Sequence, residues 1–154
     1  MKKTDFTIQE MEVVYLPRKL KTSNETVTSS GDAYHVLKQL FNPNTISYQE
    51  ECVVIYLNHA SRIIGAQKLS KGGINATVVD IRIILATALK SLSSAFIIAH
   101  NHPSGRLSPS ESDREITKQL YEASKLMDIM LLDHIIIAPD KGYYSFLDEG
   151  VLDS

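Results

Sequence analysis

Apolar and polar positions along this chain follow two periodicities, one typical of strands and one typical of helices. Apolar runs rich in β-branched and aromatic residues predict strands over residues 11–16, 50–57, 62–68, 95–99, 131–138 and 143–146. Apolar residues at helical spacing predict helices that begin near Ser30, Asp80 and Ser108. Strands that alternate with helices in this way indicate an α/β domain, in which helices pack on a mixed sheet.

The third helix has the clearest start signal. The run Ser108-Pro109-Ser110-Glu111 fits a capping box, with Ser108 as N-cap and Glu111 three residues later. We expect the buried stripe of this helix to hold Ile116, Leu120, Ala123 and Met127. Asp113 lies three residues before Ile116, so its carboxylate shares the buried face and needs a partner there.

Composition limits the class of protein. The 154 residues are 44% hydrophobic and 22% charged, which is typical of a globular domain. No apolar run reaches the ~20 residues that cross a bilayer, and no apolar segment follows Lys2 and Lys3, so we expect neither a membrane span nor a secretory signal. Cys52 is the only cysteine, which excludes an internal disulfide and favours the cytoplasm. The net charge of −2 argues against direct nucleic-acid binding.

Two histidines directly follow the predicted strand at residues 95–99. Side chains two residues apart in a strand point to the same face, so we expect His100 and His102 to converge at the end of this strand. Asp113 supplies a third group from the buried face of the next helix. Two imidazoles and a carboxylate, with a fourth position for water, are the ligands of a catalytic zinc ion. The pattern therefore predicts that His100, His102 and Asp113 bind Zn²⁺.

The spacing of these residues also matches a known signature. His100-x-His102, seven residues, Ser110, two residues and Asp113 fit H-x-H-x7-S-x2-D without a gap, so the chain resembles the JAMM (MPN+ or JAB) metalloprotease family. The strings at residues 100–105 and 132–136 resemble its RadC branch. This resemblance covers about residues 30 to 150 and implies a cytidine-deaminase-like α/β fold with one zinc ion. We expect residues 1–29 to form an N-terminal strand or extension, and residues 30–154 to form the RadC-like JAB/MPN domain.

The same resemblance implies a glutamate as general base, at the start of the strand before the predicted hairpin. Gln49-Glu50 matches the RadC branch, but Glu51 is adjacent. In a regular strand Glu50 shares a face with Cys52, and Glu51 shares a face with Val53. Both faces are apolar and a slip of one residue would exchange the two acids, so the pattern leaves both open. From the resemblance we expect Glu50.

Ser110 and His134 each have two interpretations. Within the signature, Ser110 would donate a hydrogen bond to the oxyanion of a tetrahedral intermediate; alternatively, it belongs only to the helix-capping cluster. We expect His134, in the apolar strand at residues 131–138, to be a structural residue with a hydrogen-bond partner. A contact behind the metal site is the alternative.

These features predict a zinc-dependent hydrolase that cuts a peptide or isopeptide bond in a peptide or protein substrate. Zinc lowers the pKa of its bound water toward ~7, and Glu50 would remove the proton. A nucleobase deaminase is excluded, because its zinc site needs P-C-x-x-C and this chain has one cysteine. A metal-free interaction module and a RadC-type accessory protein of DNA repair are the alternatives. Neither the substrate nor the oligomeric state follows from the signature.

Overall fold

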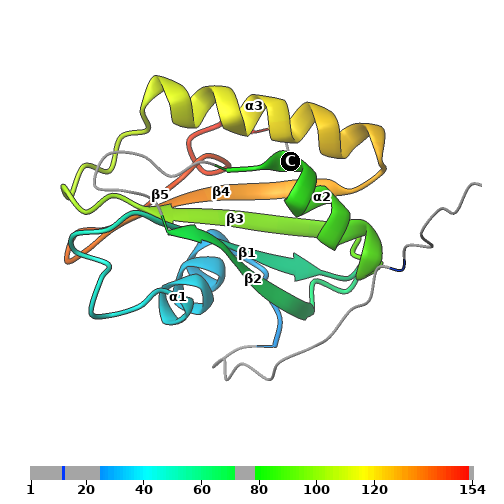
Figure 1. Ribbon diagram of the computed structural model, residues 1–154, viewed down its shortest axis with the longest axis horizontal. Helices are drawn as coiled ribbons and strands as arrows, with labels where there is room; N and C mark the ends of the chain where they lie inside the picture. The colour runs from blue at the N-terminus through cyan, green and yellow to red at the C-terminus, as the bar shows by residue number, and fades with distance from the viewer. Residues whose placement is uncertain (1–11, 13–24, 72–78, 153–154) are drawn as a thin grey trace, which may run out of the picture.

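Five strands and three helices form in the part of the chain that the structure describes (Figure 1). The computed structural model describes residues 12, 25–71 and 79–152. In chain order the elements are α1 (Ser30–Leu40), β1 (Glu51–Leu57), β2 (Ile63–Lys71), α2 (Ile81–Lys90), β3 (Ala95–Asn101), α3 (Glu111–Leu126), β4 (Met130–Ala138) and β5 (Gly142–Ser145). The strand expected at residues 11–16 lies almost wholly outside the described residues. None of the described helices has both the length and the apolar character needed to span a membrane.

The strands form one mixed sheet in the order β2-β1-β3-β4-β5. β3 and β4 are parallel and are joined through α3, whereas the other neighbouring pairs are antiparallel. β1 and β3 lie inside the sheet and are buried along their whole length, which explains their nearly continuous apolar sequences. The predicted α/β fold with a mixed sheet is confirmed.

Helices cover both faces of the sheet, α1 on one side and α2 with α3 on the other (Figure 1). Alternate residues of each strand therefore enter different hydrophobic clusters. In β1, Val53 and Ile55 pack in the cluster with α1, while Cys52 and Val54 pack in the cluster with α2 and α3. The face under α2 and α3 is the one that carries the candidate site.

The start of α3 differs from the prediction. The N-cap is Ser110, not Ser108, and the residue three positions later in the capping box is Asp113, not Glu111. The serine-x-x-acid pattern occurs twice here with an offset of two residues, so both registers satisfy the local rule. The second register places the Asp113 carboxylate beside two histidines, and this tertiary contact explains which one forms.

The buried face of α3 is also more polar than expected. Leu120 is buried as predicted, but its buried neighbours along the helix are Thr117 and Ser124. Met127, expected in the stripe, is 45% exposed. A histidine of β4, His134, accounts for part of this change, because it requires a hydrogen-bonding residue opposite and finds the Thr117 hydroxyl.

Candidate metal centre

His100 and His102 converge at the end of β3. His100 lies within the strand, two residues after Ile98, and His102 follows the last residue of the strand. Ile98 packs in the cluster with α2 and α3, so alternation along the strand directs both rings to that face of the sheet. Both residues are buried, and their Nε2 atoms are 2.9 Å apart. The predicted strand-end geometry of this pair is present.

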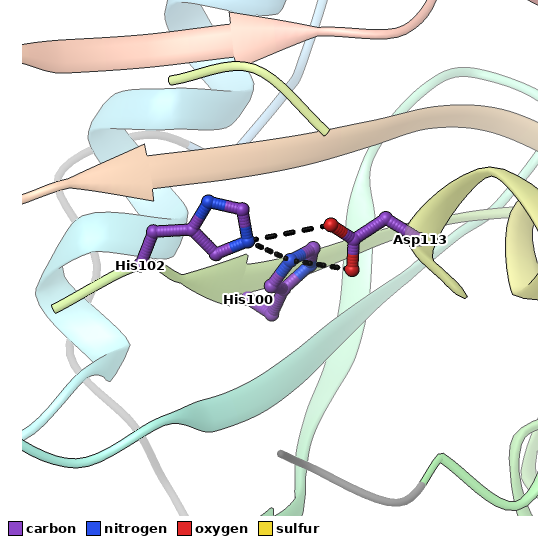
Figure 2. A group of neighbouring side chains, drawn as sticks. All are labelled: His100, His102 and Asp113. Carbon is purple, nitrogen blue, oxygen red and sulfur yellow. Dashed lines mark hydrogen bonds and ion pairs between the residues drawn. The ribbon is translucent and has the colours of Figure 1, made fainter. Parts of the chain in front are cut away.

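Asp113 reaches the same point from the first turn of α3 (Figure 2). Its Oδ1 lies 3.1 Å from Nε2 of His100, and its Oδ2 lies 3.4 Å from Nε2 of His102. One ligand atom from each of the three residues falls within 4.8 Å of the others. The structure thus brings the three predicted ligands into one largely buried group that can hold a metal ion.

The ring of His102 is oriented by the turn that follows it. Gly105 has a φ of +80°, a conformation that glycine adopts without strain, and its N–H donates to the carbonyl of His102. The chain therefore folds back and brings the carbonyl of Arg106 to 2.8 Å from Nδ1 of His102. A carbonyl only accepts, so Nδ1 of His102 carries a proton, and Nε2 is the ring nitrogen that faces the site.

The ring of His100 is held by a different group of residues. Its Nδ1 lies 2.7 Å from Nε2 of His134, a fully buried residue of β4. Nδ1 of His134 in turn lies 2.6 Å from the Thr117 hydroxyl, which also lies 2.5 Å from the Asp113 carbonyl. The hydrogen-bond partner expected for His134 is thus His100 itself, so the alternative interpretation, a contact behind the metal site, describes its position.

Charge is distributed unevenly over this group. Burial by itself would raise the pKa of Asp113, but the contacts of its carboxylate with the His100 and His102 rings outweigh burial and hold that pKa well below its usual range. Burial likewise would lower the pKa of His102, but the Asp113 carboxylate and the Arg106 carbonyl raise it. Burial and the neighbouring His100 ring lower the pKa of His134 well below its usual value. The site therefore combines an ionised carboxylate with a neutral His134 behind it.

Glu50 and Glu51 take different sides of the sheet. Glu50 lines the cavity that also contains His100, His102 and Asp113. Glu51 is buried, and its carboxylate accepts a hydrogen bond from the Thr45 hydroxyl. The structure thus places Glu50, and not Glu51, on the side of the sheet that carries the candidate metal site. The sequence pattern alone left this choice open.

The cavity over the site has a volume of about 530 Å³. Ser110, the other predicted catalytic residue, lies on its wall, and its Oγ accepts a hydrogen bond from the N–H of Asp113. Cys52 also lines the cavity, but burial raises the pKa of its thiol to about 12, so it stays protonated and behaves as a small apolar residue. The remaining wall includes several short polar side chains and one arginine, namely Ser104, Arg106, Ser108 and Ser112.

Asn101, which the sequence analysis did not single out, holds the segment that carries Glu50. It is completely buried between the two histidines, with its side chain on the opposite face of β3. Its Oδ1 accepts from the N–H of Glu51 at 2.6 Å, and its Nδ2 donates to the carbonyls of Ile46 and Gln49 at 2.7 and 2.8 Å. An amide inside an otherwise apolar strand was the available signal, because a buried amide must be hydrogen-bonded.

Comparison with known proteins identifies similar chains. A family model described as a RadC-like JAB domain matches residues 27–151. A UPF0758 protein of Flavobacterium johnsoniae is 41% identical over 125 residues, which cover 81% of this chain and 53% of that protein. A UPF0758 protein of Porphyromonas gingivalis is 40% identical over 137 residues, which cover 89% of this chain and 59% of that protein.

A shorter relative matches over more of its own length. The UPF0758 protein YeeS of Escherichia coli is 40% identical over 104 residues, covering 68% of this chain and 70% of that protein. Against the first two relatives, by contrast, the match spans little more than half of their length. The names of all three carry no activity, so the chemistry must be argued from the site.

Proposed function

Because this chain belongs to the RadC-like JAB domain family, we propose that it is a zinc-dependent hydrolase that cuts peptide or isopeptide bonds. One observation carries the proposal. His100, His102 and Asp113 converge within a cavity that Glu50 and Ser110 also line. Together these residues would supply a metal-ligand set, a base and a hydroxyl donor around one space.

The donor set fits a zinc ion. Two imidazole nitrogens and one carboxylate oxygen leave a position open in tetrahedral coordination, as catalytic zinc sites do. Bound there, the ion would supply acidity to a water molecule and polarise a substrate carbonyl. The largely buried position of the three ligands lowers the local dielectric and strengthens this effect.

Glu50 is the proposed proton carrier. Its carboxylate would take a proton from the attacking water and return it to the leaving amine. Ser110 would stabilise the negative charge that develops on the substrate during the attack. Its Oγ accepts from the Asp113 N–H, so its own hydroxyl proton can be donated to the oxyanion that develops on the substrate.

The substrate in this proposal is a peptide or protein segment, and the compartment is the cytoplasm. The cavity is large enough for side chains on either side of a scissile amide and contains short polar groups that suit a peptide backbone. A single buried, protonated cysteine is compatible with a reducing environment.

Elemental analysis together with a cleavage assay tests the proposal. Protein purified without chelator should contain one zinc ion per chain, and the His100→Ala variant should contain none. The zinc-loaded protein should cleave members of a library of peptides and isopeptide-linked peptides, and a chelator should stop the cleavage. A protein that neither contains zinc nor takes it up would overturn the proposal. Zinc uptake without cleavage, together with retarded DNA in a gel-shift assay, would favour the DNA-associated alternative.

A further inference from the structure

We propose that Thr117 and His134 are positioning residues that fix the proton of His100 on Nδ1 and so keep its Nε2 lone pair directed at the metal site. The inference rests on the metal centre of the proposed function and does not depend on the bond that is cut. It follows from the direction of each hydrogen bond in the chain of contacts that joins Asp113, Thr117, His134 and His100.

The direction is set at the backbone carbonyl of Asp113. A carbonyl oxygen only accepts, so the Thr117 hydroxyl, 2.5 Å away, must donate to it. A hydroxyl has a single proton, and Thr117 has then used it. Toward Nδ1 of His134, 2.6 Å away, the same oxygen is therefore an acceptor. Nδ1 of His134 must carry a hydrogen.

Burial decides whether the other ring nitrogen of His134, Nε2, carries a proton. The residue is 2% exposed, and its ring stacks on Phe146 with centroids 4.7 Å apart and planes inclined by 8°. A charged ring is disfavoured in this apolar position, so His134 has one N–H and its Nε2 accepts. The partner of Nε2 is Nδ1 of His100 at 2.7 Å, which must therefore be the donor.

The proton of a neutral His100 thus lies on Nδ1, and its Nε2 faces Asp113 Oδ1 at 3.1 Å with a lone pair. The chain of hydrogen bonds begins at the Asp113 carbonyl and ends beside the Asp113 carboxylate, so one residue connects both ends. His102 reaches the same state separately, through the Arg106 carbonyl. Two independent arrangements therefore prepare two imidazoles for one metal ion.

The matched variants Thr117→Val and Thr117→Ser test this inference. Valine has nearly the same shape but no hydroxyl, whereas serine keeps the hydroxyl. Without an acceptor at Nδ1, His134 is free to move its proton to Nε2. Nε2 would then donate to Nδ1 of His100, which reverses the direction of that hydrogen bond. The readout is nitrogen NMR of ¹⁵N-histidine-labelled protein, which reports the tautomer of each ring, measured with and without zinc.

We expect His134 as the Nδ1–H tautomer in the parent protein and in Thr117→Ser, and a shift toward Nε2–H in Thr117→Val. Nδ1 of His100 should lose its proton in the valine variant, while the tautomer of His102 stays unchanged. Zinc affinity, measured by competition with a chelator, should fall by about 10- to 100-fold in Thr117→Val and recover in Thr117→Ser. Thermal unfolding of both variants controls for a loss of folding.

A second pair examines His134 directly. Glutamine at this position offers an amide oxygen near the place of Nε2, so His134→Gln should keep more zinc affinity than His134→Leu. The inference is overturned if Thr117→Val leaves the tautomers and the zinc affinity unchanged. If the parent protein binds no zinc, the proposed function fails, and the tautomers of the metal-free protein still decide the inference.

Discussion

Ser110 and Asp113 exchange two hydrogen bonds at the start of α3. The N–H of Ser110 donates to Oδ2 of Asp113 at 2.7 Å, and the N–H of Asp113 donates to Oγ of Ser110 at 3.1 Å. The same Asp113 carboxylate faces the two histidines. The carboxylate that caps the helix is therefore also the candidate metal ligand, so a change in the cap alters the candidate site directly.

We expect Ser110→Ala to weaken both the helix and the site. Loss of the cap should lower the free energy of unfolding by about 1 kcal/mol, and a less constrained Asp113 should lower zinc affinity. At saturating zinc, kcat should also fall by about 10²-fold if the hydroxyl donates to the oxyanion. Ser29→Ala is the matched control, since Ser29 caps α1 in the same way and should affect stability alone. A normal kcat for Ser110→Ala at saturating zinc would limit Ser110 to capping.

Asp113→Asn should abolish zinc binding while the chain stays folded. Asparagine keeps an oxygen that can accept from the Ser110 N–H, but it removes the anionic ligand from between the histidines. Asp32→Asn provides the control, because Asp32 makes similar bonds at the start of α1, with Thr28 and Ser29. Zinc content by elemental analysis should be near zero in Asp113→Asn and unchanged in Asp32→Asn. Equal zinc content in the two variants would contradict the ligand assignment.

Much of the fold could be predicted because the sequence marks its elements locally. β1 and β3 have nearly continuous apolar sequences, and Ser30 opens a helix where the pattern placed it. The convergence of His100 and His102 likewise follows from strand geometry alone. These features depend on residues that are close in the sequence, so a pattern can reveal them.

The features that could not be predicted depend on contacts between distant segments. Two serine-x-x-acid registers compete at the start of α3, and the histidines of β3 distinguish them. The role of Thr117 requires β4 to lie under α3, because only then does His134 meet its hydroxyl. The side of the sheet on which Glu50 lies depends on the backbone N–H of Glu51, which donates a hydrogen bond to the Asn101 side chain on the neighbouring strand.

Glu50→Gln and Glu51→Gln should differ strongly in turnover. Glu50 faces the cavity, so glutamine there should reduce kcat by about 10²-fold or more while zinc content stays normal. Glu51 lies on the other side of the sheet, where its carboxylate accepts a hydrogen bond from the Thr45 hydroxyl. A glutamine oxygen can accept the same hydrogen bond. Glu51→Gln should therefore keep most of its activity. Cleavage rates of both zinc-loaded variants test this, and a reversed order would make Glu51 the base.

Asn101→Asp should affect Glu50 more than the metal ligands. Aspartate still accepts from the N–H of Glu51, but it replaces two N–H donors to backbone carbonyls with an oxygen. Leaving buried polar groups without these bonds costs about 1–3 kcal/mol each, so stability should fall clearly. We expect kcat at saturating zinc to fall more than zinc affinity, because the amide's partners all lie beside Glu50. Parallel losses of both quantities would instead indicate general unfolding around β3.

The pH dependence of stability should reveal Asp133, a buried carboxylate on β4. Burial raises the pKa of Asp133 above the ordinary value of 3.8, despite hydrogen bonds from Ser145, Leu147 and the His134 N–H. The folded protein therefore holds this proton more tightly than the unfolded chain does. As the pH rises through 3.8, the unfolded chain ionises first, and stability falls until the pH passes the raised pKa.

Asp133→Asn should remove this loss of stability, because an amide does not ionise. Its oxygen can accept from both N–H groups, and its nitrogen can donate to the Ser145 hydroxyl. Urea unfolding between pH 3 and 7 should show the variant gaining stability relative to the parent as the pH rises. Asp32→Asn should show the opposite trend, because hydrogen bonds from Thr28 lower the pKa of Asp32, and the stability that its carboxylate contributes is present above 3.8 and lost in acid. Parallel pH profiles for the two variants would refute the assignment of opposite pKa shifts to these two aspartates.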